Sequence, residues 1–239
     1  MVIGSAESYR EVLLRGRWFS SVSEETRDWL IGRGLVREYS AGQAVFKQGD
    51  RPDGLYAVLE GAVLLTSVEW GQEIALSRME PPTWFGEAST FDRRPRSHLA
   101  RAEEKTICLV IPADYVDQRM SEYPTFMREL AESLASKLRL TLIGLAEMAA
   151  LPLGVRAARR LLLIAEAYGE RVEAAPRSIS LRQEQLASML AVSRQTVNQA
   201  LKDLETRGCV RLSYGVIEIV DVDKLKAVAQ VATSILPPP

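Results

Sequence analysis

A short loop near the middle of the chain carries residue types that bind a charged small molecule. Gly86 and Glu87 lie shortly before Arg96 and Ser97, and β-prone sequence flanks the loop on both sides. A guanidinium offers a rigid fork of donors to an anion such as a phosphodiester. The serine hydroxyl and backbone N–H groups can complete such a site if a short helix begins here. A carboxylate can accept a hydrogen bond from a ligand hydroxyl.

The same loop permits a purely structural interpretation. Glu87 and Arg96 could offset each other's charge, because a buried ion alone costs several kcal/mol, and the pair could simply tie the loop down. His98 follows Ser97 and adds a titratable ring near this loop. We expect His98 itself to be a packed or solvated surface residue.

Composition argues against an enzyme and against a metal site. The 239 residues include one histidine and two cysteines, Cys108 and Cys209, which form no C-x-x-C pair. These are too few for a zinc finger or a cysteine-ligated iron–sulfur cluster. The P-loop, dinucleotide-binding, zinc-protease and serine-hydrolase motifs are absent from the sequence. The cysteine usage and the lack of signal-peptide character at the N-terminus predict a cytoplasmic protein.

Charge is distributed unevenly along the chain. The formal net charge is −1, but residues 151–239 contain 12 Lys/Arg and 9 Asp/Glu, a balance of +3. Residues 1–150 therefore carry −4. A mildly basic C-terminal third is compatible with nucleic-acid binding without demonstrating it.

Hydrophobic patterns divide the chain into regions of different secondary structure. Residues 8–33 have a helical pattern, with serine and glutamate at a helix start. Between residues 36 and 111, short apolar or alternating runs separated by glycine-containing turns predict a small antiparallel sandwich or barrel. The pattern becomes helical near residue 121. A hinge is predicted at residues 151–154, followed by another helix over residues 154–168.

The long helical segment has a narrow apolar stripe that repeats every three or four residues. Its members are Met127, Leu130, Leu134, Leu138, Leu142, Leu145 and Met148. The stripe could pack on the β domain of its own chain or form a seam between two subunits. We favour the seam, because the stripe continues beyond any plausible edge of the β domain.

Residues 180–210 predict two helices joined by a tight turn. Ser193 can cap the second helix, and Val197, Leu201 and Leu204 form its buried stripe. The outer face then carries polar side chains suited to contacts with DNA bases, namely Arg194, Gln195, Asn198, Gln199 and Lys202. Ser193 and Thr196 are expected to contact phosphates. The following alternating residues surround a Ser-Tyr-Gly turn and predict a β-hairpin wing. The combination favours a DNA-binding motif over an ordinary helical hairpin.

This order of regions resembles the cyclic AMP receptor protein (CRP)/FNR family of bacterial transcription regulators. The most specific segments are FKQGDRPDGLYAVLEGAV, FGEASTFDRRPRSHLARA and LASMLAVSRQTVNQALKDLE. The resemblance implies an α+β fold with a β-roll, or jelly-roll, cyclic-nucleotide-binding domain over residues 1–120. A dimerisation helix over residues 121–151 and a winged helix-turn-helix domain over residues 152–239 would follow.

The resemblance also implies a cyclic nucleotide effector, most directly cyclic AMP. In this family the loop holds the nucleotide, which assigns Arg96 to the phosphate and Glu87 to the ribose 2′-hydroxyl. The positions implied to bind ligand are Leu76, Ser77, Gly86, Glu87, Arg96, Ser97 and Thr141. DNA with a palindromic operator, a second copy of the chain and RNA polymerase are the implied partners.

Two residues depart from the cyclic AMP-binding pattern. Leu142 stands where a serine reaches the nucleotide from the other subunit, and His98 stands where a small residue usually follows Arg-Ser. The first departure weakens the case for adenine-specific recognition. A haem held by His98 or Cys108 is a further possibility within this family.

Three functional hypotheses follow from these observations. The first is a homodimeric, ligand-responsive transcription regulator. The second is a signal-binding module that acts through protein partners, against which the winged motif argues. The third is a DNA-binding regulator whose barrel is a vestigial or differently liganded scaffold.

Overall fold

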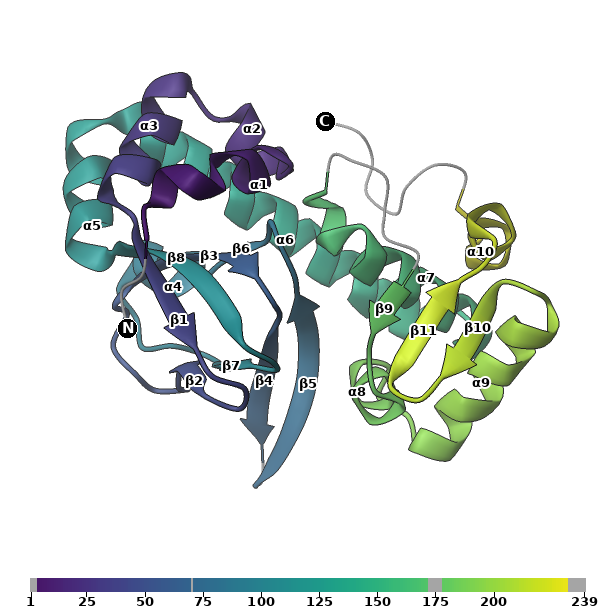
Figure 1. The fold of residues 1–239 in the computed structure, drawn as a ribbon. Helices are drawn as coiled ribbons and strands as arrows, with labels where there is room; N and C mark the ends of the chain where they lie inside the picture. Colours follow the sequence, from purple (N-terminus) through teal and green to yellow (C-terminus); the bar gives the residue numbers. More distant parts are fainter. Residues whose placement is uncertain (1–3, 70, 172–177, 232–239) are drawn as a thin grey trace.

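The N-terminal half is a β-roll made of two antiparallel sheets (Figure 1). The structure is a computed structural model that describes residues 4–69, 71–171 and 178–231. Within these residues the strand orders of the two sheets are β1-β8-β3-β6 and β2-β7-β4-β5. The strands are β1 (Leu35–Tyr39), β2 (Ala44–Phe46), β3 (Gly54–Glu60), β4 (Val63–Glu69), β5 (Gln72–Met79), β6 (Trp84–Phe85), β7 (Leu99–Ala102) and β8 (Thr106–Pro112).

Strand β3 shows why part of this region is continuously apolar instead of alternating. Successive side chains of a strand point to opposite faces. Tyr56 and Val58 belong to the cluster inside the roll. Leu55, Ala57 and Leu59 belong to a second cluster, shared with the N-terminal helices. Both faces of the strand are therefore buried, so neither face favours polar residues.

Short helices pack beside this sheet. They are η1 (Ala6–Tyr9), α1 (Arg10–Leu14), α2 (Arg17–Ser21), α3 (Glu24–Arg33) and α5 (Ala113–Glu122). The predicted helical region over residues 8–33 is thus a series of separate helices. Ser23 caps α3, because its side chain accepts a hydrogen bond from the Thr26 N–H at 3.3 Å.

The long helix α6 (Pro124–Ala150) connects the β-roll to the C-terminal half (Figure 1). The expected start of the long helix at residue 121 is wrong. Helix α5 runs to Glu122, a break follows at Tyr123, and α6 begins at Pro124. Tyr123 has extended backbone angles because the residue before a proline is disfavoured in the α conformation. Pro124 then occupies the first turn of α6, where no N–H donor is required.

The C-terminal half begins after an extended break at Leu151 and Pro152, at the predicted hinge. Its elements are α7 (Leu153–Ala165), η2 (Ala167–Gly169), β9 (Ser178–Ser180), α8 (Gln183–Met189), α9 (Arg194–Thr206), β10 (Val210–Ser213), β11 (Val216–Ile219) and α10 (Val222–Ala229). The predicted helix over residues 154–168 ends earlier, at Ala165. The predicted hairpin wing is present, and β9 extends it to a sheet of order β10-β11-β9 among the described residues.

Candidate ligand-binding loop and DNA-binding surface

The loop of interest turns from β6 into a short helix, α4 (Glu87–Asp92). Gly86 precedes the helix with a left-handed φ of 85°. A Cβ atom at this position would lie 2.8 Å from Nη1 of Arg96. Glycine is therefore required both for the backbone conformation and for the close approach of the guanidinium.

Arg96 lies inside the roll, with only 2% of its surface exposed. Its Nη1 donates to the Gly86 carbonyl at 2.7 Å, and its Nη2 donates to the Gly54 carbonyl at 2.6 Å. Nη2 also pairs with Oδ1 of Asp53 at 2.9 Å. The guanidinium carbon lies 4.2 Å from the ring centroid of Phe46, which adds a cation–π contact. Arg96 is thus fixed by the protein itself, and its Nε has no partner in the described part of the chain.

Glu87 and Arg96 do not offset each other's charge, so this expectation was wrong. Each has a different ionic partner: Asp53 pairs with Arg96, and Lys137 of α6 pairs with Oε1 of Glu87 at 2.9 Å. Lys137 Nζ also donates to the Trp84 carbonyl at 2.7 Å. Glu87 is 7% exposed, and its Oε2 has no hydrogen-bond partner among the described residues.

Sequence reasoning missed both of these ionic partners. Lys137 precedes Thr141 by one helical turn, so residue spacing places both side chains on one face of α6. Asp53 lies three residues before Tyr56, whose hydroxyl donates to it at 2.5 Å. The spacing of Lys137 from Thr141 was the available signal for the first. The pairing of Asp53 with Arg96 could be foreseen only with knowledge of the sheet topology.

Two other predicted ligand positions, Ser97 and Thr141, are exposed. Ser97 is exposed, and its Oγ lies 2.7 Å from Nδ1 of His98. Thr141 is exposed, and its hydroxyl donates to the Lys137 carbonyl at 2.9 Å. This bond is internal to α6 and does not itself connect Thr141 to the loop.

Leu76 and Ser77 lie on β5 at an irregularity in its pairing with β4. Leu65 pairs with Ser77 and Thr66 pairs with Ala75, so Leu76 is the extra residue. Leu65 packs on the core inside the roll. Because directly opposite residues of a strand pair share a face, Ser77 also faces the interior. The Leu76 carbonyl instead accepts a 3.5 Å hydrogen bond from Arg160 of α7.

Helix α9 presents a polar face next to a buried stripe. Val197, Leu201 and Leu204 are buried as predicted. Ser193 caps the helix, because its Oγ accepts the Thr196 N–H at 3.1 Å. All five proposed DNA contacts are exposed, namely Ser193, Arg194, Gln195, Thr196 and Gln199.

The polar face continues onto α8 and the wing. Arg194 pairs with Glu184 of α8 at 3.0 Å, and Asn198 donates to Gln183 at 2.8 Å. The carbonyl of Gly215 at the wing tip accepts the N–H of Leu181, which precedes α8, at 3.0 Å. Tyr214 at the same tip is fully exposed. These α8 and wing contacts were not anticipated from the sequence.

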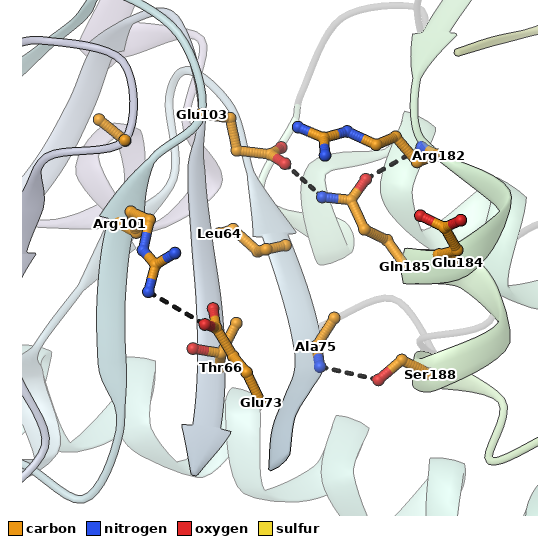
Figure 2. A pocket seen from close by; sticks show the side chains of 12 residues that line it. Leu64, Thr66, Glu73, Ala75, Arg101, Glu103, Arg182, Glu184, Gln185 and Ser188 are labelled. Atoms are coloured by element: carbon orange, nitrogen blue, oxygen red, sulfur yellow. Dashed lines mark hydrogen bonds and ion pairs between the residues drawn. The ribbon is translucent and has the colours of Figure 1, made fainter. Parts of the chain in front are cut away.

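The two halves of the chain meet between the β4–β5 hairpin and α8, around a cavity of about 370 Å³ (Figure 2). The Ala75 N–H donates to Oγ of Ser188 at 2.8 Å. Gln185 donates to Glu103, which also pairs with Arg78 at 2.7 Å. The C-terminal half is therefore held on the sheet that carries Leu76 and Ser77.

The predicted apolar stripe of α6 is divided in two. Leu130 is fully buried in the core beneath the N-terminal helices. Further along the same helix, the exposed side chains include Leu138 at 60%, Leu142 at 56% and Leu145 at 65%. Leu130 thus packs on its own domain, whereas Met127 at the start of the stripe is 44% exposed, and the last part of the stripe is an exposed apolar surface in the single chain.

The cysteines and the histidine form no metal site in the part of the chain that the structure describes. Cys108 is fully buried in the core of the roll, and burial raises the pKa of its thiol to about 12. Burial also raises the pKa of Cys209. Across the described residues, no helix is long and apolar enough to cross a membrane.

A β-roll, a connecting helix and a winged helix-turn-helix define a class of ligand-sensing DNA-binding regulators. Residues 36–123 match the model of the cyclic nucleotide-binding domain, and residues 155–228 match that of the Crp-like helix-turn-helix domain. The second match supports DNA binding over a module that acts only through protein partners.

Relatives and solved structures agree with these matches. The chain is 30% identical to a CRP-like cAMP-activated global transcriptional regulator of Mycobacterium tuberculosis, over 90% of this chain and 97% of that protein. It is 30% identical to the cyclic AMP receptor protein of Thermus thermophilus, over 88% and 95%. A CRP/FNR-family transcriptional regulator of T. thermophilus superposes with a TM-score of 0.64 at 26% identity, covering 82% of this chain and 98% of that one. The chain belongs to the CRP/FNR family of transcription regulators.

Proposed function

We propose that the effector of this regulator is cyclic AMP, bound at the loop that carries Glu87 and Arg96. The observation that carries the proposal is the buried Glu87 carboxylate, in which Lys137 satisfies one oxygen and the other lacks a partner among the described residues. A buried acceptor without a donor is unfavourable. A ribose 2′-hydroxyl would supply that donor. The names of the 30% identical relatives support the same effector.

Arg96 would bind the cyclic phosphate in this proposal. Three of its five N–H donors bind protein acceptors, which leaves the Nε–H and one N–H of Nη1 for the phosphate, and the bond to Asp53 can release a further donor. Asp53 is about half-exposed and can turn toward water when the phosphate replaces it. Ser97 would add its hydroxyl to the phosphate, and Thr141 would contact the base. Leu76, Ser77 and Gly86 would complete the walls.

Calorimetry with two ligands tests the assignment of Glu87. Protein freed of co-purified nucleotide is titrated with cyclic AMP and with 2′-deoxy cyclic AMP. The wild type should bind the deoxy ligand about tenfold more weakly, which corresponds to one hydrogen bond to a charged group. Glu87→Gln should lose most of this preference, and Arg96→Ala should weaken both ligands by about 1.5–3 kcal/mol.

Glu38→Gln is a matched control. Glu38 pairs with Lys105 at 3.0 Å on the outer strand β1 and has no place in the proposed site. It should bind both ligands like the wild type. If the wild type binds neither cyclic AMP nor any other cyclic nucleotide, the proposed effector is wrong.

A second candidate is a DNA-binding regulator with a vestigial or differently liganded roll. The internal hydrogen bonds of Arg96 favour it, because protein acceptors already take three of the five N–H donors. A thermal-shift panel of cyclic AMP, cyclic GMP, cyclic di-GMP, haem and 2-oxoglutarate separates the candidates. A ligand that binds only the native state must raise the melting temperature, so no shift with any cyclic nucleotide supports the second candidate.

The exposed part of the α6 stripe supports a homodimer as the working unit. In this proposal residues 1–120 sense the ligand, residues 121–151 pair with their two-fold mate and residues 152–239 bind DNA. These first and last ranges extend over residues outside the described ones. A ligand near Thr141 would change how two α6 helices pack, and the break at Leu151–Pro152 would pass this change to the DNA-binding half.

The proposal also covers the remaining partners. Two α9 helices would enter successive major grooves of a palindromic operator, with half-sites about one helical turn apart or a multiple of it. Family membership supports contact with RNA polymerase, a cytoplasmic location and a role without catalysis. Arg194, Gln195 and Gln199 would contact bases, while Ser193 and Thr196 would contact phosphates.

A further inference from the structure

The second half of α6 has two apolar faces, and they meet different partners. One is the exposed part of the stripe, which is proposed to pair with a second copy of the chain. The other carries Leu140 and Ile143, which are partly buried and pack against the core of the C-terminal half. Because residues three or four apart share a helix face, Glu147 continues this second face toward the end of α6. The helix that would pair with its mate therefore also contacts the half that carries α9.

Glu147 forms an ion pair that spans the break at Leu151 and Pro152. Its Oε1 lies 2.7 Å from Nη1 of Arg159, which belongs to α7. The side chains of Glu147 and Arg159 are only 11% and 18% exposed. Either charge alone would be costly in such a place, so the pair favours one relative position of α6 and α7.

The guanidinium of Arg159 also holds the end of α10. Its Nε donates to the Ala229 carbonyl at 2.7 Å, and its Nη2 donates to the Gln230 carbonyl at 3.4 Å. A cation at the C-terminal end of a helix is stabilised by the helix dipole. Ala229, Leu161 of α7 and Leu201 of α9 belong to one core cluster. Arg159 thus connects α6 to the packed unit that carries α9.

We propose that Arg159 is a positioning residue for DNA binding, which fixes the direction of α9 relative to α6 through its ion pair with Glu147. This inference rests on the homodimer of the proposed function. When two α6 helices pair through their exposed faces, each Arg159 sets the place of one α9 helix, and the two together set the separation of the DNA readers. A palindromic operator presents two major-groove sites at one spacing and one rotation. Loss of Arg159 should therefore relax the spacing requirement, while each α9 keeps its own DNA contacts.

Affinities for three DNA probes test this role, each measured with and without cyclic AMP. The probes are a palindrome obtained by selection from random DNA, the same palindrome with two base pairs inserted between its half-sites, and a single half-site. The insertion rotates one half-site by about 70° relative to the other. It should weaken binding of the wild type about tenfold or more and that of Arg159→Met about threefold or less. Affinity for the single half-site should stay within about twofold of the wild type, whereas a merely destabilised variant would lose affinity for all three probes alike.

Two further variants and a control complete this test. Glu147→Gln should relax the spacing requirement less than Arg159→Met, and the double variant should relax it no further than Arg159→Met. The double variant leaves no lone buried charge and replaces Arg159→Met if that variant does not fold. Glu132→Gln is the matched control, because it removes the same charge from an exposed α6 pair with Arg128 at 3.4 Å, and it should discriminate like the wild type. A wild type that tolerates the insertion, or variants that discriminate as strongly as the wild type, would overturn the proposal.

Hydrogen exchange separates this inference from the proposed homodimer. If selection yields no palindrome, or the wild type binds it no more tightly than the half-site, the homodimer of the proposed function fails. Exchange at residues 226–231, measured without DNA or ligand, then decides the role of the ion pair. Glu147→Gln should accelerate this exchange about threefold, because Glu147 orients the guanidinium that holds the end of α10, and it should have no effect in the Arg159→Met background. Equal acceleration in both backgrounds, or none in either, would overturn the proposal.

Discussion

Two arginines of this chain are proposed to bind anionic or polar ligand groups, and they differ in burial and in their hydrogen bonds to the protein. Arg96 is buried in the sensor half and makes three hydrogen bonds to protein acceptors. Arg194 lies on the DNA-binding surface with 68% of its side chain exposed and a single acidic partner, Glu184. A ligand at Arg96 must exchange for existing partners or use the two N–H donors that these bonds leave, one on Nε and one on Nη1. DNA at Arg194 replaces a weak surface pair.

The largest expected effect follows from this difference in burial. Arg96→Ala removes three hydrogen bonds, one of them to a charged partner, and leaves Thr90 as the remaining donor near the carbonyls of Gly54 and Gly86. We expect a loss of about 3 kcal/mol in the free energy of unfolding. Asp53 contributes less to this loss because it can hydrate. Urea denaturation measures the change. Arg194→Ala is the matched control and should lie within about 0.5 kcal/mol of the wild type. Equal losses for both variants would contradict the comparison.

The two parts of α6 offer a second test of the same contrast. Leu130 is buried in its own domain, so Leu130→Ala should lower the free energy of unfolding by about 3 kcal/mol and leave the oligomeric state unchanged. Leu138 is exposed in the single chain, so Leu138→Asp should yield folded monomers with weakened DNA binding. Light scattering and circular dichroism distinguish the outcomes. A wild-type protein that is monomeric at micromolar concentration would remove the basis for the proposed seam.

Much of the fold could be predicted from the sequence, because the relevant patterns are local. The buried stripe of α9 follows from 3.6-residue periodicity, the Ser193 cap from residue type, and the wing from its Ser-Tyr-Gly turn. Strand β9 has three residues, Ser178–Ser180, which is too short for a periodic signal. Its pairing with β11 depends on tertiary contact.

The candidate site was less predictable because its charges come from distant parts of the chain. Residue types alone placed Glu87 and Arg96 on one loop, and the obvious inference was that they pair. Their actual partners, Lys137 and Asp53, lie about 40 to 50 residues away in sequence. Only the packing of α6 and β3 against the loop decides which opposite charges meet. The division of the α6 stripe after Leu130 likewise depends on where the β-roll ends.

A third prediction concerns base selection by α9. Arg194 can donate two hydrogen bonds to O6 and N7 of guanine, so Arg194→Ala should cost about 1–3 kcal/mol at one position of each half-site and relax the guanine requirement there. Glutamine pairs best with adenine, so Gln195 and Gln199 should favour adenine at their positions. Selection of binding sites from random DNA measures all three preferences.

Lys202→Ala provides the comparison for this selection experiment. Lys202 is exposed on the polar side of α9, and a phosphate contact should weaken all sequences about equally. If Arg194→Ala behaves in the same uniform way, Arg194 contacts phosphate and does not select a base. A selected motif identical to that of the cyclic AMP receptor protein would show that Gln195 and Gln199 do not set specificity.

The smallest expected effect belongs to Glu184, the partner of Arg194. Two consequences of Glu184→Gln oppose each other. Arg194 loses a group that orients it, while the DNA phosphates lose a nearby negative charge that repels them. Because both side chains are largely exposed, we expect a net change in affinity below about 1 kcal/mol. Repulsion is screened by salt, so the variant should bind more tightly than the wild type at low salt, and the gain should vanish at high salt.

The control is Glu218→Gln, which breaks the exposed wing pair with Arg211 at 2.7 Å. It removes the same charge without affecting the ion pair of Arg194. A loss of guanine preference in Glu184→Gln but not in Glu218→Gln would show that Glu184 orients Arg194. Equal behaviour of the two variants would show that only the charge matters.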